Sequence, residues 1–372
     1  MKIRPVINAN ATVTVLGGSL MPPPVVQAMV DAAGQFVDLP AMYEEVGERI
    51  AELTHNEAAC VTAGAAAAIT LVVASCIGEP AQAFPVAAEV VMFASQRNGY
   101  DYSARLTGAR VVEVGPTVEE LKAALAGHPT PPGVEAGAAP PGVGDGMVAR
   151  PACVLWFAGA HYAAGALPIE DVVRVAGEVG VPVIVDAAAQ VPPASSLWRF
   201  TTEIGADAVI VSGGKGLRGP QTTGLVLGRR WLVDRCRRHA SPNQEIGRGM
   251  KVGKEELAAL LAAVEWTLEQ DEEALLAGYE RSVALWVDGL QGLPGITAYR
   301  GYPSEAGQPH GRAVLRFTNR SRADVITALW DNNPRIAVGT FGVAHNELAL
   351  NPQTLQPGED QLVLDALRHL LT

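Results

Sequence analysis

The chain has 372 residues, enough for one large domain and a smaller one, and 48% of them are apolar, which is typical of a folded protein rather than a disordered one. Only 18% are charged and the net charge is -11, so a general affinity for nucleic acids or anionic membranes is not expected. An anionic substrate would have to be bound by a few local cations.

The sequence contains no sign of a membrane span, a signal peptide or a metal site. The opening MKIRPVINANATV lacks the apolar core of a signal peptide, and no stretch approaches the roughly 18 to 20 unbroken apolar residues of a spanning helix. We therefore expect a cytoplasmic protein. The four cysteines form no C-x-x-C pair, so we expect buried free thiols and no metal; they are Cys60, Cys76, Cys153 and Cys236.

Taken in chain order, the first 230 residues alternate between apolar, β-rich runs and helical patterns. Strands are expected at 58–62, 89–93, 110–114, 153–157, 182–186, 207–212 and 224–227, with helices at 65–76, 118–126 and 169–179. This alternation predicts an α/β fold with a doubly wound, mainly parallel sheet.

The remaining segments suggest how the chain is divided. Residues 128–150 are dense in Pro, Gly and Ala and are expected to form a surface insertion. We expect an N-terminal segment at 1–50, a large domain at 51–250, linker helices at 251–290 and a small α+β domain at 291–372. In the small domain the expected elements are strands near 296–299, 313–318 and 335–338, and helices at 322–330 and from 358.

Two strands end in residues of complementary chemistry. VPVIVDAAAQ places Asp186 at a strand end, and DAVIVSGGKG places Lys215 just beyond the end of the next strand. The carboxyl ends of parallel strands form the ligand crevice of an open sheet. Pyridoxal phosphate (PLP) chemistry requires such a pair, a lysine amine for the Schiff base and a buried carboxylate for the ring nitrogen. Each residue alone is commonplace at a strand end.

Two further features strengthen the PLP interpretation. Ser212 lies three residues before the lysine, where it can reach a phosphate. The Gly-rich TAGAAAAIT at 62–70 ends a strand and opens a helix, so its free amides predict an anion site.

Two nucleotide-binding motifs compete for the same residues. The run from Gly214 to Gly219 fits G-x-G-x-x-G, but Pro220 and a strand follow where a dinucleotide site requires a helix. A phosphate-binding P-loop would need Ser or Thr after Lys215, and Gly216 stands there. Neither motif is therefore favoured.

At these residues the chain resembles fold-type-I PLP enzymes of the selenocysteine synthase-like branch, and more closely the D-glucosaminate-6-phosphate ammonia-lyase family. The resemblance covers nearly the whole chain except 128–150. The segments that carry it are INANATVTVLGGSLMPPPVVQAM (7–29), ELTHNEAACVTAGAAAAI (52–69), QRNGYDYSARLTGA (96–109), WFAGAHYAAGALPIEDVV (156–173), SGGKGLRGPQTTGLVLG (212–228) and GRGMKVGKEEL (247–257).

The resemblance implies an aminotransferase-like fold and a role for each matched residue. Lys215 resembles the Schiff-base lysine and Asp186 the partner of the ring nitrogen. The cofactor-binding set that it implies is Gly64, Ala65 and Ala66 for the phosphate, His161 beside the ring, and Gly219, Gln221 and Thr222 in a turn that reaches a neighbouring subunit's cofactor. The candidate substrate-binding set is Arg97, Tyr100, Arg248 and Lys251, with Lys254 in the same basic motif.

The function implied is a PLP-dependent lyase that removes water and ammonia from a β-hydroxy amino acid, such as D-glucosaminate or its 6-phosphate. Other PLP reactions, by an aldolase, a racemase or a β-replacement enzyme, remain open because they use the same Lys and Asp. A non-catalytic PLP-binding protein is the alternative of another class. We expect a small-molecule amino acid substrate, no nucleic-acid partner and a homodimer or higher even oligomer.

Overall fold

A computed structural model describes residues 3–129, except 81–87, and residues 148–372, except 150. Most of the expected insertion at 128–150 therefore lies outside the described residues. Its two ends are described, and β5 (His128–Pro129) pairs antiparallel with β6 (Val148–Ala149). None of the helices within the described ranges is long and apolar enough to cross a membrane.

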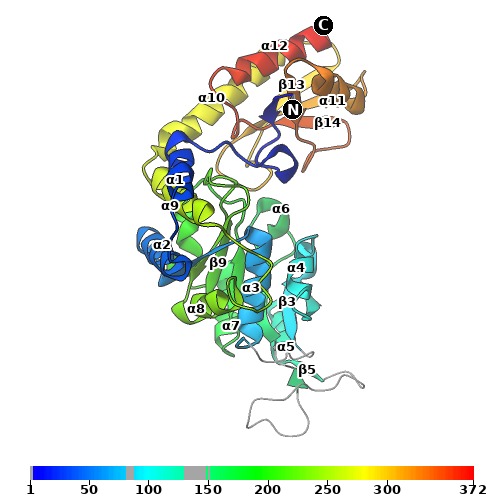
Figure 1. The fold of residues 1–372 in the computed structure, drawn as a ribbon. Coiled ribbons are helices and arrows are strands. Elements are labelled where there is room, and N and C mark those ends of the chain that lie inside the picture. Colours follow the sequence, from blue (N-terminus) through cyan, green and yellow to red (C-terminus); the bar gives the residue numbers. More distant parts are fainter. Residues whose placement is uncertain (1–2, 81–87, 130–147, 150) are drawn as a thin grey trace. The chain divides into compact units, whose positions relative to one another are not determined.

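The chain forms two compact units (Figure 1). The larger unit comprises residues 21–268 and the smaller one combines residues 1–20 with 269–372. This division differs from the expected one, because the first 50 residues are shared between the two units. All candidate site residues belong to the larger unit.

A seven-stranded sheet forms the centre of the larger unit. Its strand order is β2-β10-β9-β8-β7-β3-β4, and all neighbours are parallel except that β10 runs antiparallel to both β2 and β9. The bounds are β2 (Ala58–Thr62), β3 (Glu89–Phe93), β4 (Arg110–Val114), β7 (Pro151–Phe157), β8 (Val183–Asp186), β9 (Ala208–Ser212) and β10 (Gly224–Gly228). The expected α/β class and the seven expected strands are confirmed.

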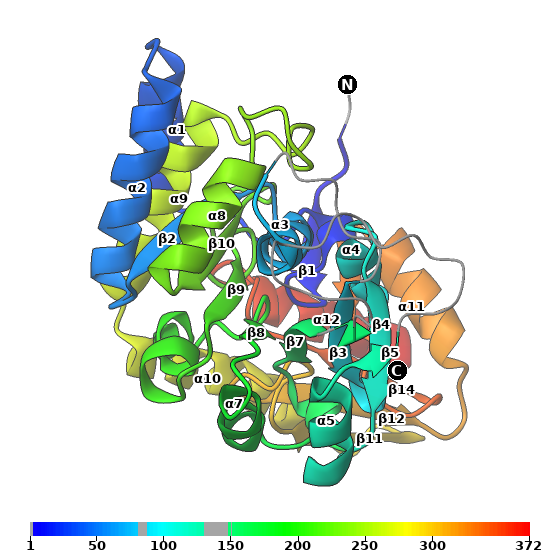
Figure 2. The ribbon, with the colours of Figure 1, turned by 90° about the horizontal axis from the view of Figure 1, so that it is seen from below.

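Helices cover both faces of this sheet (Figure 2). One face packs against α2 (Leu39–Leu53), α5 (Val118–Leu125), α7 (Ile169–Gly177) and α9 (Lys254–Leu268), with α1 (Pro23–Ala33) lying along α9. The other face packs against α3 (Ala65–Ile77), α4 (Asp101–Arg105) and α8 (Arg230–His239). Because the central strands are buried on both faces, their sequences read as continuous Val and Ile runs rather than alternating ones.

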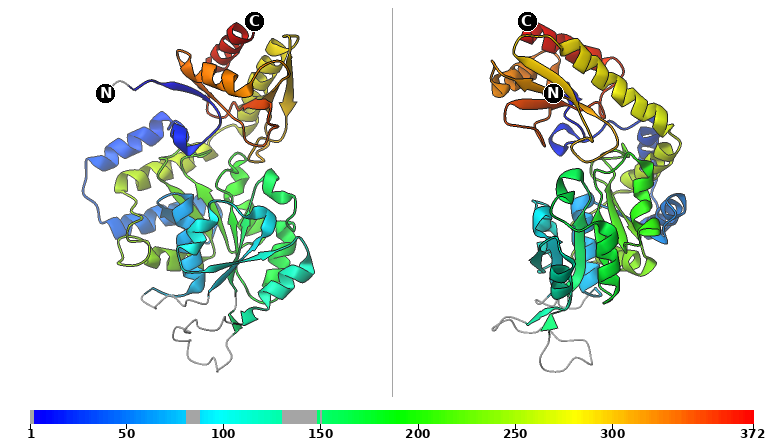
Figure 3. Two further views of the ribbon diagram at one scale, coloured as in Figure 1. Left: turned by 90° about the vertical axis from the view of Figure 1, so that its right-hand side faces the viewer. Right: turned by 180° about the vertical axis from the view of Figure 1, so that it is seen from behind.

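The smaller unit is the α+β body expected at the carboxyl end, completed by the first residues of the chain (Figure 3). Its three-stranded sheet has the order β11-β12-β14, and a separate parallel pair joins β1 to β13. The strands are β1 (Val6–Ala9), β11 (Ile296–Gly301), β12 (Arg312–Phe317), β13 (Arg335–Val338) and β14 (Glu347–Leu350), and the helices are α10 (Glu272–Leu290), α11 (Arg322–Asp331) and α12 (Glu359–Leu371).

Candidate active site

The lysine lies in a tight turn that follows β9. Backbone hydrogen bonds close the turn, from Gly213 N to Thr223 O at 2.8 Å and from Gly219 N to Gly213 O at 2.8 Å. A Cβ at Gly214 would lie 2.4 Å from the Cα of Gln221, so this position admits only glycine without a backbone shift. The close packing fixes the turn, and with it the place of Lys215 at the end of β9.

Asp186 is the last residue of β8, and its side chain is almost fully buried, at 6% exposure. One carboxylate oxygen accepts a hydrogen bond from the backbone N of Ala188 at 2.9 Å. Its neighbours in the sheet are Phe157 on β7 and Ile210 on β9. Asp186 accepts no other side-chain hydrogen bond from the described residues.

The carboxylate and the amine influence each other without forming an ion pair. Burial raises the pKa of Asp186, and the positive charge of Lys215 partly opposes that shift. Burial likewise lowers the pKa of Lys215, against the attraction of Asp186. No hydrogen bond or ion pair within the described chain engages the Lys215 amine. The site therefore holds a buried acid and a buried amine that are not paired with each other.

The candidate phosphate site lies at the start of α3. Gly64 precedes the helix with a φ of +91°, and a Cβ placed there would meet no atom of the described residues within 4 Å, so they leave the space beside the loop open. The first amides of a helix, here those of Ala65 and Ala66, have no partner within the helix and favour an anion. Ser212 lies near this loop, because Gly224 pairs with both Ser212 and Thr62 across the sheet.

His161 and Tyr162 lie in α6 (Ala160–Ala163), just beyond the end of β7. The His161 side chain is exposed, and its ring centroid lies 3.8 Å from that of Tyr162. Burial raises the pKa of Tyr162, and the negative charge of Asp186 raises it further. The sequence places both residues at this end of the sheet and makes His161 the candidate beside the ring; in the structure, the Asp186 charge acts on the pKa of Tyr162.

The candidate substrate residues after β3 are already engaged in part. Arg97 forms ion pairs with Asp101 and Glu113, which together raise its pKa. Tyr100 is exposed at 51%. To bind a substrate anion, Arg97 would have to exchange at least one of these carboxylates, so its role as a substrate residue stays a prediction.

The turn after Lys215 and the basic motif contain some side chains that form hydrogen bonds within the described chain and others that do not. Thr222 Oγ1 donates to Glu256 at 3.1 Å, while Gln221 is exposed. Lys254 Nζ donates to the carbonyl of Ala32 at 2.7 Å, near the end of α1, and so joins two helices. In contrast, the side chains of two neighbouring cations make no hydrogen bond or ion pair with the described residues; they are Arg248 and Lys251.

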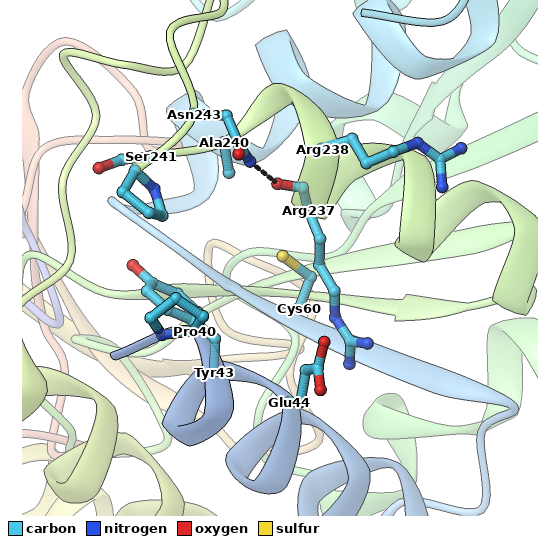
Figure 4. Close-up of a pocket in the computed structure, with 10 residues that line it drawn as sticks. Pro40, Tyr43, Glu44, Cys60, Arg237, Arg238, Ala240, Ser241 and Asn243 are labelled. Carbon is cyan, nitrogen blue, oxygen red and sulfur yellow. Dashed lines mark hydrogen bonds between the residues drawn. The ribbon is translucent and has the colours of Figure 1, made fainter. Parts of the chain in front are cut away.

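A separate pocket of about 220 Å³ lies between the beginning of α2 and the end of α8 (Figure 4). Arg237 and Tyr43 line it together with Cys60, whose thiol has its pKa raised to about 11 by burial. Arg237 Nη2 donates to Ala59 O at 2.9 Å and so caps the outer edge of β2. None of the candidate site residues lines this pocket. Among the residues that the structure describes, no group of three metal-ligating side chains is found.

Comparison with known proteins identifies relatives along the whole chain, although no protein-family model matches it. The chain is 32% identical to 5'-C-glycyluridine monooxygenase-decarboxylase from Streptomyces sp. over 99% of its length and 90% of that protein. It is 29% identical to D-glucosaminate-6-phosphate ammonia lyase from Salmonella typhimurium over 99% of its length and 96% of that protein.

Solved structures agree with these relatives. A structure of D-glucosaminate-6-phosphate ammonia-lyase matches with a TM-score of 0.78 and 28% identity, over 99% of this chain and 96% of that one. A structure of SPT with PLP shares the fold, with a TM-score of 0.61 at 15% identity, over 98% of this chain and 88% of that one.

The fold and the matches define the protein as a fold-type-I PLP enzyme. The chain belongs to the family that contains 5'-C-glycyluridine monooxygenase-decarboxylase and D-glucosaminate-6-phosphate ammonia lyase. The resemblance noted from the sequence, the expected fold class and the expected cofactor are confirmed.

The residues at the strand ends fit PLP. The cofactor needs an amine for its aldehyde, an acid for its ring nitrogen and an anion site for its phosphate. Among the described residues, the Lys215 amine has no partner and one oxygen of the buried Asp186 carboxylate accepts no hydrogen bond, while the loop at Gly64 precedes the first turn of α3. These three groups come from adjacent or nearby strands of one sheet.

Proposed function

We propose that the protein is a PLP-dependent ammonia lyase that acts on a β-hydroxy amino acid of the D-glucosaminate type. The product would be a 2-keto-3-deoxy acid, and the released molecules would be water and then ammonia. The observation that carries this proposal is the full-length match to D-glucosaminate-6-phosphate ammonia lyase, with a TM-score of 0.78. The Lys215 amine, which has no partner in the described part of the chain, and the buried Asp186 support it.

When bound, PLP withdraws electrons from the Cα of an amino acid that is joined to it. Lys215 would act as the base at Cα, because its lowered pKa leaves more of the amine unprotonated and able to accept the proton. The same Nζ would deliver that proton to the β-hydroxyl, which leaves as water. Asp186 would accept a hydrogen bond from the protonated ring nitrogen and stabilise its positive charge.

The substrate's acidic groups need cations that are not already neutralised. Arg248 and Lys251 fit this role, because their side chains have no partner among the described residues. Arg97 is a weaker candidate, since Asp101 and Glu113 already balance its charge. We therefore assign substrate binding first to the basic motif and second to Arg97.

A second candidate function is the oxidative decarboxylation of an amino acid attached to a nucleoside. The observation that favours it is the match at 32% identity to 5'-C-glycyluridine monooxygenase-decarboxylase. On this chain either reaction would start from an amino acid joined to PLP, so Lys215 and Asp186 would serve both. Only the second would consume oxygen and release carbon dioxide.

One assay separates the candidates. The purified, PLP-loaded protein is incubated with D-glucosaminate, with its 6-phosphate and with a glycyl nucleoside, while ammonia, keto acid and oxygen are measured. We expect ammonia and keto acid in equal amounts from a glucosaminate substrate, with no oxygen consumed. Oxygen consumption with the nucleoside alone would favour the second candidate. Turnover of none of them, with PLP bound, would favour the aldolase, racemase, β-replacement or non-catalytic alternatives.

We also propose that the enzyme is a cytoplasmic homodimer or higher even oligomer. The support is the family resemblance of Gly219–Thr222 to a turn that reaches a neighbouring subunit's cofactor, together with the exposed Gln221 in that turn. Light scattering combined with activity measurement tests this proposal, and a stable, fully active monomer would contradict it.

A further inference from the structure

Gln96 occupies an unusual position after β3. The strand ends at Phe93, and Gln96 closes the short helical turn η2 (Ala94–Gln96) with a side chain that is 0% exposed. Its Nε2 donates to Phe157 O at 3.2 Å, and its Oε1 accepts from Phe157 N at 2.9 Å. One side chain thus satisfies both backbone groups of the last residue of β7, as a neighbouring strand otherwise would.

The bonded residue, Phe157, adjoins the candidate acid. Phe157 is the sheet neighbour of Asp186, and the next residue, Ala158, donates its N–H to the backbone O of Asp186 at 2.8 Å. Gln190 Nε2 donates to Ala158 O at 3.0 Å. The carboxyl end of β7 is therefore held by Gln96 on the β3 side and by the Asp186 segment on the other side.

Gln96 also joins two loops that contain candidate site residues. Its own carbonyl accepts from Asn98 Nδ2 at 2.8 Å, within the loop that contains Arg97 and Tyr100. The turn η2 packs against α6, the helix that contains His161 and Tyr162. Gln96 therefore connects three parts of the site: its side-chain amide holds Phe157, the sheet neighbour of Asp186, while its backbone and its turn contact the two loops.

We propose that Gln96 is a positioning residue of the PLP site, which it serves through Phe157. The proposal rests on the assignment of Asp186 to the ring nitrogen. Without the amide, Phe157 would keep a buried N–H and C=O with no partner, and the end of β7 would shift to satisfy them. That shift would move the backbone of Asp186, and a charge-assisted hydrogen bond tolerates little displacement.

The test compares Gln96→Met with a control at the opposite end of the sheet. Methionine has a similar length and no amide, so it removes both hydrogen bonds at nearly constant volume. The control is Asn56→Leu, because Asn56 Nδ2 donates to Leu197 O at 2.9 Å and its Oδ1 accepts from Thr201 at 2.6 Å, before the start of β2. For each variant we would measure the melting temperature of the PLP-free protein and titrate it with PLP, following the visible spectrum.

Both variants should lower the melting temperature, but only Gln96→Met should weaken PLP affinity, by at least about tenfold, with a shifted visible band. The control should change the affinity by less than about twofold. An affinity and spectrum of Gln96→Met equal to those of the control would overturn the positioning role. If Gln96→Met does not fold, Gln96→Asn decides by the same comparison, because its amide is one carbon too short to reach both groups.

Two features of this design keep its outcome separate from the other proposals. The titration contains no substrate, so a missing lyase activity would leave its result unchanged. Asp186→Ala is titrated in parallel. If Asp186→Ala loses PLP affinity while Gln96→Met does not, the assignment of Asp186 to the ring nitrogen is supported and the positioning role of Gln96 is contradicted.

Discussion

Replacing Asp186 by Asn tests the central assignment of the site with a minimal change in shape. The carboxylate is 6% exposed, and one of its oxygens accepts from Ala188 N at 2.9 Å. An Asn oxygen can keep this hydrogen bond, as Asn and Asp do interchangeably in such turns, so the fold should persist. The other position would become an NH₂ group, which cannot accept a hydrogen bond from a protonated ring nitrogen.

The expected magnitude follows from burial. A hydrogen bond to a charged group in a water-poor site is worth about 1.5 to 3 kcal/mol, and its loss would also remove the proton from the ring nitrogen. We expect turnover to fall by at least about a hundredfold, which corresponds to about 2.7 kcal/mol of transition-state stabilisation. The covalent link to Lys215 should form with a smaller loss.

Steady-state kinetics beside the visible spectrum measures both effects. Asp207→Asn is a matched control, because Asp207 Oδ2 accepts from Val183 N at 2.9 Å at the other end of β8. Near-normal turnover in Asp186→Asn, or an equal loss of turnover in the control, would show that Asp186 only stabilises the turn after β8.

Further predictions concern Lys215 and its turn. Borohydride reduction of the PLP-loaded protein should label Lys215, and Lys215→Ala should remove the label; a label on another lysine would contradict the assignment. Because burial lowers the pKa of Lys215, the unfolded chain binds more protons than the folded one between that pKa and the ordinary value of 10.5, so this group's contribution to stability rises with pH there. PLP-free Lys215→Met should therefore be more stable than the wild type at pH 7. Chemical denaturation should show that the difference in free energy of unfolding between the two proteins decreases toward pH 10; a difference that is constant with pH would contradict burial of the Lys215 amine as its cause. Gly214→Ala places a Cβ 2.4 Å from the Cα of Gln221, so it should cost about 1 to 3 kcal/mol of stability and weaken PLP binding. Thermal melts and PLP titrations measure both effects, and Gly249→Ala, whose Cβ would meet no described atom within 4 Å, should change neither.

Much of the central sheet could be predicted from the sequence, because its strands are buried on both faces. The runs expected at 58–62, 89–93 and 110–114 coincide with β2, β3 and β4. A fully buried strand needs an unbroken apolar run, and such a run is visible without knowledge of its neighbours. The direction of β10 and the order of the strands depend on pairing and were not predicted.

The amino-terminal segment shows a different limit. Residues 1–20 were expected to belong to a separate segment of 50 residues, yet β1 pairs with β13 over Val6–Ala9 and Arg335–Val338. The four residues VINA contain no local signal of that pairing. A parallel pair between segments more than three hundred residues apart is decided by the complementary surfaces of the folded unit.

The sequence by itself determined the α/β class and identified Asp186 and Lys215 as candidates. Both follow predicted strands, and the carboxyl ends of parallel strands line the ligand crevice, so their positions along the chain predict where they lie in the fold. Only the tertiary structure decided which cations remain available: Arg97 is paired with acids and Lys254 with a helix end, while Arg248 is not paired within the described chain. It also brought Gln96 to Phe157, 61 positions away, where both backbone groups need a partner. A side-chain hydrogen bond between distant segments leaves no periodic pattern in a sequence, since it depends on which strands become neighbours and where each one ends.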